Sequence, residues 1–224
     1  DEREAAVIAG DLKALNDSRK DLTVKGLEQA VSLVESTDLK KDNVLVVYLP
    51  ECHESLAGII AGRIREYYNK PVLVFTNVEE GIKGSGRSIE AYNMFEELIR
   101  CSDLLSRFGG HPMAAGLSLP SENLEELRRR LNKNTTLQEE DFIPVVRIDV
   151  PMPIGYITET FVDELELLEP FGKGNTKPLF AEQHFKLLGG AIIGKNKNIL
   201  NITTPIDDVS STSIVDTMET NNKY

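Results

Sequence analysis

The sequence predicts an α/β domain, with a mixed sheet flanked by helices, followed by a small β-barrel domain. Residues 43–75 contain an apolar β-branched run, a helical pattern and a second apolar run, which is the order of a βαβ unit. Beyond residue 142 the pattern changes to short runs typical of strands. A polar stretch, residues 132–141, separates the two patterns and is the candidate linker. A chain of 224 residues is long enough for two such domains.

The first expected element is a long helix over residues 4–36. Its apolar residues recur at helical spacing, with Leu12, Leu15, Leu22 and Val34 among them. Gly26 lies inside this pattern and is a candidate break in the helix.

The βαβ unit comes next. Residues 43–49 are almost all apolar, which predicts a buried strand. Ser55 is the expected N-cap of a helix that continues to Tyr68 with one apolar face. Pro71 precedes a second strand over residues 72–75, and this strand–helix–strand order favours parallel pairing.

Glycine-rich segments dominate the rest of the α/β domain. Residues 81–88, GIKGSGRS, contain too many glycines for a central strand, so we expect a turn or an exposed hairpin. A helix through residues 94–99 follows, and then a tight turn at 108–112 and a short strand at 117–119. A last helix is expected from Ser121, its cap, to Leu131.

The second domain is expected to be mostly β. Strand-like runs occupy residues 145–150, 180–188, 199–204 and 213–217, and one short helix is expected over 158–168. Five or fewer strands suit a small barrel. The last twenty residues are polar and contain no obvious closing strand, which leaves open whether the barrel is complete.

Charge argues against a general nucleic-acid binder, because the net charge is −11 and lysine and arginine supply most non-specific affinity for phosphates. The charge is uneven, however. Residues 171–204 contain five lysines and one acidic residue. This stretch is either a solvated hairpin surface or a local contact for nucleic acid.

Two cysteines are too few for a disulfide framework, and no apolar run is long enough to span a bilayer. We therefore expect a cytoplasmic protein. The sequence opens without methionine and in the middle of a helical pattern, so we expect that it was cut from a longer protein.

No self-contained catalytic motif is visible. The three histidines, His53, His111 and His184, are scattered and do not form a spaced ligand set, so no metal site is predicted. Cys52 and His53 are adjacent, but neighbouring side chains on a strand point apart, which makes a catalytic pair a weak hypothesis.

Two glycine-rich segments could still bind a ligand. In residues 83–88, Ser85, Ser88 and backbone N–H groups are possible donors, and Arg87 could clamp a phosphate; a flexible turn with an exposed arginine is the alternative. In residues 109–116, Gly109 and Gly110 present His111, which could donate to a phosphate oxygen or simply bond to nearby backbone.

Together, the motif SGRS at 85–88 and the motif FGGHPMAAGLSL at 108–119 resemble the DHH-associated domain of RecJ exonucleases. PECHESLAGIIAGR at 50–63 and NDSRK at 16–20 are similar to further segments of that family, although Ser55-Leu56 stands where the family usually has Gly-Val. EPFGKGN at 169–175 resembles an element of the family's OB-fold domain.

This resemblance implies a division into a connector helix (1–41), a DHH-associated substrate-binding domain (42–134) and an OB-like nucleic-acid-binding domain (142–224). It also implies 5′-to-3′ degradation of single-stranded DNA in recombination and repair, in the bacterial cytoplasm. Two metal ions, manganese or magnesium, would be bound by ligands on a preceding DHH domain. The Asp-His-His motif that supplies such ligands in the family does not occur in these residues. The chain alone is therefore expected to be inactive and to bind no metal.

The resemblance further implies roles for individual residues. His111 would be catalytic, and the substrate phosphate would be bound by Ser85, Arg87, Ser88, Gly109 and Gly110. Single-stranded DNA would contact Phe171, Lys173, Lys177, Lys195 and Lys197 in the OB-like domain. Two alternatives remain: a DHH-family phosphodiesterase for short oligonucleotides or cyclic dinucleotides, and a non-catalytic single-strand-binding or docking module.

Overall fold

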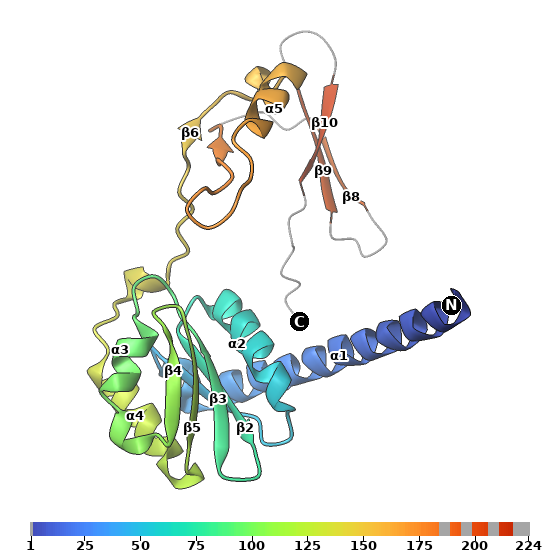
Figure 1. Cartoon of the computed structure of the whole chain (residues 1–224). Helices are drawn as coiled ribbons and strands as arrows, with labels where there is room; N and C mark the ends of the chain where they lie inside the picture. Colours follow the sequence, from blue (N-terminus) through green and yellow to red (C-terminus); the bar gives the residue numbers. More distant parts are fainter. Residues whose placement is uncertain (1, 184–188, 194–198, 206–210, 217–224) are drawn as a thin grey trace. The chain divides into compact units, whose positions relative to one another are not determined.

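The computed structural model describes residues 2–183, 189–193, 199–205 and 211–216 (Figure 1). The chain divides into two compact units, Asp1–Pro144 and Val145–Tyr224. Among the described residues, no helix combines the length and the apolar character needed to cross a membrane.

A five-stranded mixed sheet in the order β1-β2-β3-β5-β4 forms the centre of the first unit. Strand β1 (Leu45–Tyr48) pairs in parallel with β2 (Val72–Asn77), and α2 (Glu54–Tyr68) connects them. Strands β3 (Ile82–Arg87), β5 (Ala114–Leu119) and β4 (Arg107–His111) add antiparallel pairs. The predicted mixed sheet and its parallel βαβ unit are confirmed.

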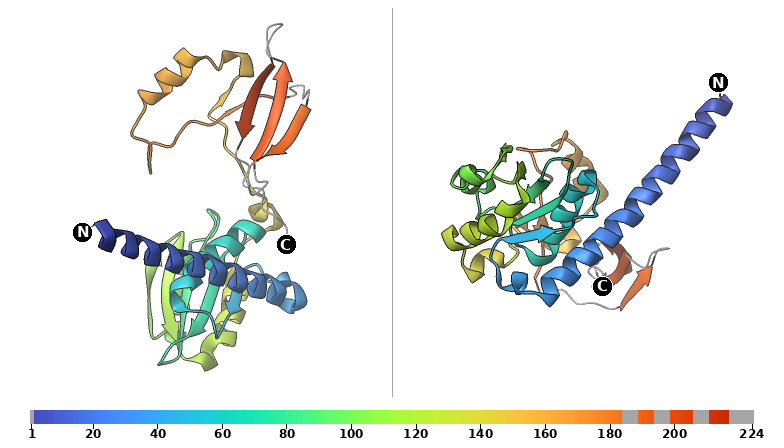
Figure 2. Two further views of the ribbon diagram at one scale, coloured as in Figure 1. Left: turned by 90° about the vertical axis from the view of Figure 1, so that its right-hand side faces the viewer. Right: turned by 90° about the horizontal axis from the view of Figure 1, so that it is seen from below.

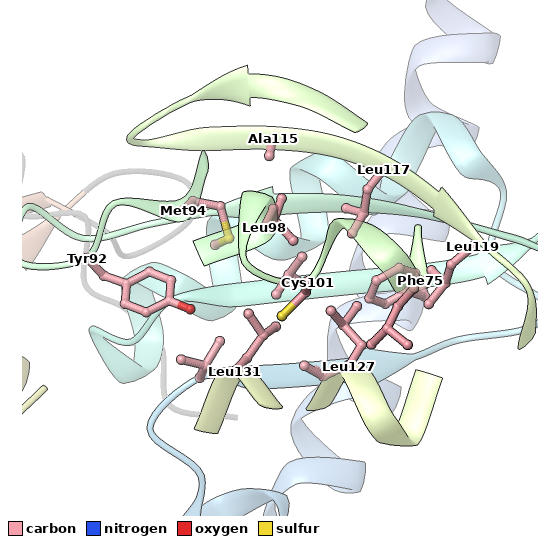
Figure 3. Close-up of a cluster of buried hydrophobic side chains, with 14 of the residues drawn as sticks. Phe75, Tyr92, Met94, Leu98, Cys101, Ala115, Leu117, Leu119, Leu127 and Leu131 are labelled. Carbon is pink, nitrogen blue, oxygen red and sulfur yellow. The ribbon is translucent and has the colours of Figure 1, made fainter. Parts of the chain in front are cut away.

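Helices cover both faces of this sheet (Figure 1). On one face, Val72 and Val74 of β2 pack against Ile60 and Ile64 of α2 and Val34 of α1 (Glu2–Ser36). On the other face, a second core lies against α3 (Met94–Ile99) and α4 (Leu124–Asn134), as Figure 3 shows. Its largest fully buried side chains include Phe75, Leu73, Ile82, Met94, Leu98, Leu119, Leu127 and Leu131. Alternate residues of β2 therefore serve two different cores.

Helix α1 is continuous, so the break considered at Gly26 is absent. A Cβ atom at Gly26 would lie 2.6 Å from the Cδ1 atom of Ile60, so the glycine allows α1 to approach α2 closely. The first half of α1 extends beyond the sheet (Figure 2), where Leu12 and Leu15 are 62% and 68% exposed. Only the second half of this helix contributes to the core.

The segment expected to be a turn, residues 81–88, is instead the central strand β3. Its glycines face the second core. A Cβ atom at Gly84 would lie 2.4 Å from the ring of Phe75, and one at Gly86 would lie 3.3 Å from the sulfur of Met94. The prediction was wrong because large side chains from other elements fill the volume that these glycines leave.

The tight turn expected at residues 108–112 is mostly strand β4, and the reversal to β5 occurs at residues 112–113. Gly110 has a φ of +154°, and a Cβ atom there would lie 2.3 Å from the carbonyl oxygen of Ala114. The strand needs glycine here because two backbones approach closely. The prediction was wrong because paired glycines were taken as the sign of a turn.

Two helix starts also differ from expectation. His53, rather than Ser55, caps α2. Ser121 begins a 3-10 turn (Ser121–Asn123) without a side-chain cap, and α4 starts only at Leu124. The expected linker at 132–141 is partly folded onto the first unit, where Leu137 is 6% exposed. The exposed stretch without regular structure is residues 144–148.

The second unit contains the expected short helix, α5 (Glu159–Glu166), capped by the Thr158 side chain. Strands β6 (Val150–Pro151) and β7 (Phe180–Ala181) form a short parallel pair. Strands β8 (Gly189–Ile193), β9 (Ile199–Pro205) and β10 (Ser211–Asp216) form an antiparallel sheet in the order β10-β9-β8. Residues 145–148, expected to be strand, are exposed and lie outside these ladders.

Candidate nucleic-acid interface

Part of the sheet in the first unit is exposed on the α2 side. Helix α2 packs on β2 and β3. Beyond it, Arg107, Gly109 and His111 of β4 and Gly116 of β5 are exposed. On the opposite side of β5, Ala115, Leu117 and Leu119 are buried in the second core. Strands β5 and β4 therefore present one open face built from alternate residues.

The strand register arranges the residues of this open face in three cross-strand rows. Going from β3 through β5 to β4, the rows are Arg87–Ala114–His111, Ser85–Gly116–Gly109 and Lys83–Ser118–Arg107. The structure thus brings Ser85, Arg87, Gly109 and His111 to one face, although they come from two separate segments of the sequence.

The imidazole of His111 is held by its own turn. The backbone N–H of Met113 donates to Nδ1 of His111 at 3.3 Å. Because that nitrogen accepts, the proton of the neutral ring is on Nε2, which is then a donor. The turn itself is fixed by Ser88 N–H to the Met113 carbonyl (2.9 Å) and Met94 N–H to the Pro112 carbonyl (3.0 Å). The hydrogen bond to the backbone therefore does not compete with a donor role for His111. It occupies Nδ1 and leaves Nε2–H available for a ligand.

Arg87 lies half-buried beside α2. Its Nη1 donates to the carbonyl oxygen of Gly86 (2.7 Å) and to the Ser85 hydroxyl (3.1 Å). A Cβ atom at Gly58 of α2 would lie 2.9 Å from Nη2 of Arg87, so the helix leaves room for the guanidinium. Among the described residues no carboxylate forms an ion pair with Arg87, which leaves N–H donors for an anionic ligand.

Ser88 occupies a different environment. Its side chain is 1% exposed, and its hydroxyl donates to the carbonyl oxygen of Tyr92 at 2.6 Å. The phosphate contact predicted for Ser88 does not fit this buried position, so Ser88 is not part of the candidate site. Gly110 lies on the core side of β4, where only its backbone is available.

The side chain of His53 has a structural contact. Its Nδ1 accepts from the backbone N–H of Ser55 (3.2 Å) and bonds to the Ser55 hydroxyl (2.8 Å). Burial raises the pKa of the neighbouring Cys52 thiol, which disfavours the reactive thiolate. A Cys52–His53 nucleophile therefore has no support in this geometry.

Potential metal ligands are not gathered in the part of the chain that the structure describes. No group of three or more histidine, cysteine, aspartate or glutamate side chains is placed to hold an ion there. These residues therefore do not fit a two-metal hydrolytic centre.

In the second unit, the loop at 169–175 is held by Asn175. Its side-chain amide donates to the carbonyl oxygens of Leu168 (2.8 Å) and Pro170 (3.1 Å). Phe171 is half-buried, and Lys177 Nζ lies 5.9 Å from the centre of its ring. Lys173 is exposed, whereas Lys195 and Lys197 lie outside the described residues.

Sequence reasoning missed four members of the open face: Lys83, Arg107, Gly116 and Ser118. The signal that could have located Lys83 is the alternation of polar residues at 83, 85 and 87 with glycines at 84 and 86, which is the period of a strand. It was overlooked because the glycines argued against a strand.

Family models match both units. A model described as the DHHA1 domain matches residues 41–136, and one described as the RecJ OB domain matches residues 148–216. These matches agree with the predicted fold class, an α/β domain followed by an OB-like domain.

Curated relatives extend the likeness over most of the chain. The single-stranded-DNA-specific exonuclease RecJ of Bacillus subtilis is 37% identical over 207 residues, which are 91% of this chain and 26% of that protein. The protein of the same name from Escherichia coli is 34% identical over 202 residues, 86% of this chain and 35% of its own length. The chain thus spans about a quarter to a third of these relatives.

Solved structures show the same correspondence. RecJ from Thermus thermophilus in complex with Mg²⁺ is 25% identical, with a TM-score of 0.76 over 99% of this chain and 33% of that one. Its complex with Mn²⁺ gives a TM-score of 0.74 at 25% identity, over 100% of this chain and 32% of that one.

Proposed function

Because this chain belongs to the RecJ family, with its DHHA1 and RecJ OB domains, we propose that it is the substrate-binding part of a single-stranded-DNA exonuclease. The observation that carries this proposal is the row that sets Arg87 and His111 on one open sheet face. Hydrolysis from the 5′ end, in bacterial recombination and repair, would use metal ligands on a DHH domain outside these residues. The setting is the bacterial cytoplasm, where the chromosome lies.

Arg87 is the phosphate-binding residue in this proposal. Its guanidinium is positioned by the Gly86 carbonyl and the Ser85 hydroxyl, and no described carboxylate competes for it. A guanidinium binds two phosphate oxygens at once through parallel N–H donors. Ser85 and the backbone at Gly109 and Gly110 border the same ligand.

His111 acts on the reacting phosphate. Its Nε2–H donates a hydrogen bond to a phosphate oxygen on which negative charge grows during cleavage. Because Nδ1 accepts from Met113, the ring carries its one proton at Nε2 and acts as a hydrogen-bond donor, not as the acid that protonates the leaving oxygen. The relatives from Thermus thermophilus were solved with Mg²⁺ and with Mn²⁺, and such an ion supplies activated water and charge neutralisation in phosphodiester hydrolysis. The residues of this chain bind and orient the substrate.

The second unit holds the following nucleotides. Lys173 and Lys177 contact phosphates of the nucleic-acid backbone, and Phe171 lies beside Lys177. The other two lysines of the prediction, Lys195 and Lys197, lie outside the described residues. Charge reversal at Lys173 and Lys177 should weaken binding of single-stranded DNA more than reversal at Arg128 and Arg129, which pair with acidic residues on α4 or near it.

The deciding experiment uses the full-length enzyme with His111→Ala, Arg87→Ala and, as a control, Arg129→Ala on α4. Losing one donor to a developing oxyanion costs about 10²- to 10³-fold in kcat, which is the effect expected of His111→Ala. Arg87→Ala should act mainly through KM, because it removes a phosphate clamp. An unfolded His111→Ala domain, or a kcat within a few-fold of the parent, would contradict the assignment.

We also propose that the chain by itself cleaves nothing, since its described residues assemble no set of metal ligands. The purified chain should leave labelled single-stranded DNA intact with Mn²⁺ or Mg²⁺. Manganese-dependent digestion that persists in a contamination-controlled preparation would overturn this part of the proposal.

A further inference from the structure

Two glycines on the open face are not required by the fold around them. A Cβ atom at Gly109 or at Gly116 would meet nothing within 4 Å, and neither residue has a left-handed φ. Gly84 and Gly110 differ, because a Cβ atom there would collide with Phe75 or with backbone. Glycine inside a strand usually destabilises it. The bare backbone at the Gly109–Gly116 pair therefore needs another explanation, such as a ligand that approaches it closely.

Basic side chains border this bare backbone on both sides. On one side is the row with Arg87 and His111, and on the other side is the row with Lys83, Ser118 and Arg107. Each row is two residues along the strands from the glycines, or roughly 7 Å. The two basic rows are thus about 13 Å apart, with no large side chain of β5 between them.

The second row lies in a shallow depression of about 460 Å³ whose lining includes Lys83, Arg107, Gly116 and Ser118. Glu54 also lines it and pairs with Lys83 at 2.7 Å. Arg107 is exposed, and no carboxylate of the described residues forms an ion pair with it. Arg107 is therefore the main uncompensated charge of the row.

We propose that Arg107, Lys83 and Ser118 form a second phosphate subsite, and that the backbone of a nucleic acid crosses Gly116 and Gly109 between this subsite and Arg87. The inference rests on the proposed function and extends it to three residues with no assigned role. An arginine, a lysine and a hydroxyl around bare backbone supply donors for phosphate oxygens. Because Glu54 already neutralises Lys83, Arg107 should contribute most of the binding.

The test measures binding of a roughly 12-nucleotide oligothymidylate to the 224-residue chain across a range of salt concentrations. Arg107→Gln should weaken binding about tenfold at low salt, as expected for a charged hydrogen bond, and should reduce the slope of log K against log salt by about 0.7. Arg129→Gln is the matched control, because Arg129 is an exposed arginine on α4, the helix that packs on the opposite face. It should leave both quantities unchanged.

Gly116→Val provides a second, independent readout. The added side chain starts in open space, so the melting temperature should stay the same or rise, while binding should fall several-fold because bulk blocks the backbone approach. Parent-like binding by both Arg107→Gln and Gly116→Val would overturn the second subsite.

The variant Arg87→Gln distinguishes a failure of the second phosphate subsite from a failure of the proposed function. If Arg87→Gln weakens binding while Arg107→Gln does not, the proposed function stands and the second subsite fails. If neither substitution has an effect, or the parent chain shows no salt-dependent binding, both fail.

Discussion

His53 and His111 have the same local bond and different surroundings. Each ring accepts a backbone N–H at Nδ1, from Ser55 and Met113 respectively. His53 uses this bond to cap α2, whereas His111 ends a strand on the open face. A backbone hydrogen bond at Nδ1 therefore does not show whether a histidine is structural or functional. The surroundings of Nε2 decide that.

The cap predicts a stability effect at His53. His53→Ala should lower the free energy of unfolding by about 0.5–2 kcal/mol, the usual cost of losing an N-cap, and His53→Asp should restore it because aspartate is a preferred cap. His111→Ala serves as the comparison and should change stability far less. Chemical denaturation of the three variants measures these differences, and equal losses at both histidines would contradict them.

Glu97 on α3 is a partly buried acid, one of whose carboxylate oxygens lacks a hydrogen-bond partner among the described residues. Arg100 donates to its Oε1 at 2.8 Å, but its Oε2 and the hydroxyl of Tyr92 have no hydrogen-bond partner among the described residues. Burial is the largest influence on Glu97 and raises the pKa of this carboxyl above its usual value.

A raised pKa gives a pH-dependent prediction for Glu97→Gln. The folded state favours the protonated carboxyl. Protonation of Glu97 therefore adds to the free energy of unfolding below the unfolded-state pKa, and this stabilisation is lost as the pH rises through the folded-state pKa. Glutamine imitates the protonated form. Relative to the parent, Glu97→Gln should therefore be more stable at pH 7 than at pH 4 in urea unfolding. A stability difference that is the same at both pH values would show that burial does not control this group.

Strand β3 shows how an element with weak intrinsic preference becomes the centre of a sheet. It pairs with β2 on one side and with β5 on the other. Glycine disfavours a strand by itself, but Phe75 and Met94 occupy the space above Gly84 and Gly86. Packing against neighbours outweighs the local cost.

Two glycines of this sheet should respond in opposite directions to the same substitution. Gly84→Ala should cost about 1–3 kcal/mol, because the new methyl group would lie 2.4 Å from the Phe75 ring. Gly116→Ala should be neutral or stabilise the protein by up to about 1 kcal/mol, because its Cβ meets nothing within 4 Å. Thermal and denaturant unfolding measure both effects, and a Gly84→Ala variant as stable as the parent would contradict the packing argument.

For the whole molecule, the stretch between the two units is the natural site of proteolysis. Residues 144–148 are exposed and have no regular secondary structure, and Arg147 lies among them. Brief trypsin treatment should cut after Arg147 and leave a resistant first unit, whose cores, with the side chains packed against them, lie within residues 27–142. Arg147→Gln should remove this early product in mass spectrometry. Earlier cleavage inside the sheet of the first unit would show that this unit is not independently compact.

Local patterns were enough to predict a large part of this protein. Runs of β-branched residues located β1 and β2, helical spacing located α1, α2 and α3, and the order of the motifs identified the two domains. The resemblance to the family predicted Ser85, Arg87, Gly109 and His111 as members of a candidate site, and their roles stay a prediction. These features depend on neighbours along the chain, so the amino-acid sequence alone determines them.

The tertiary structure decided which surfaces those residues share. Residues 82–87 became a central strand because side chains distant in sequence fill the gaps beside its glycines, which no local pattern reveals. The pairing register then set Arg87 in one row with His111, set Lys83 in another with Arg107, and left Ser88 buried. Register and burial are properties of packed strands, so the composition of the open face emerges only when the chain is folded.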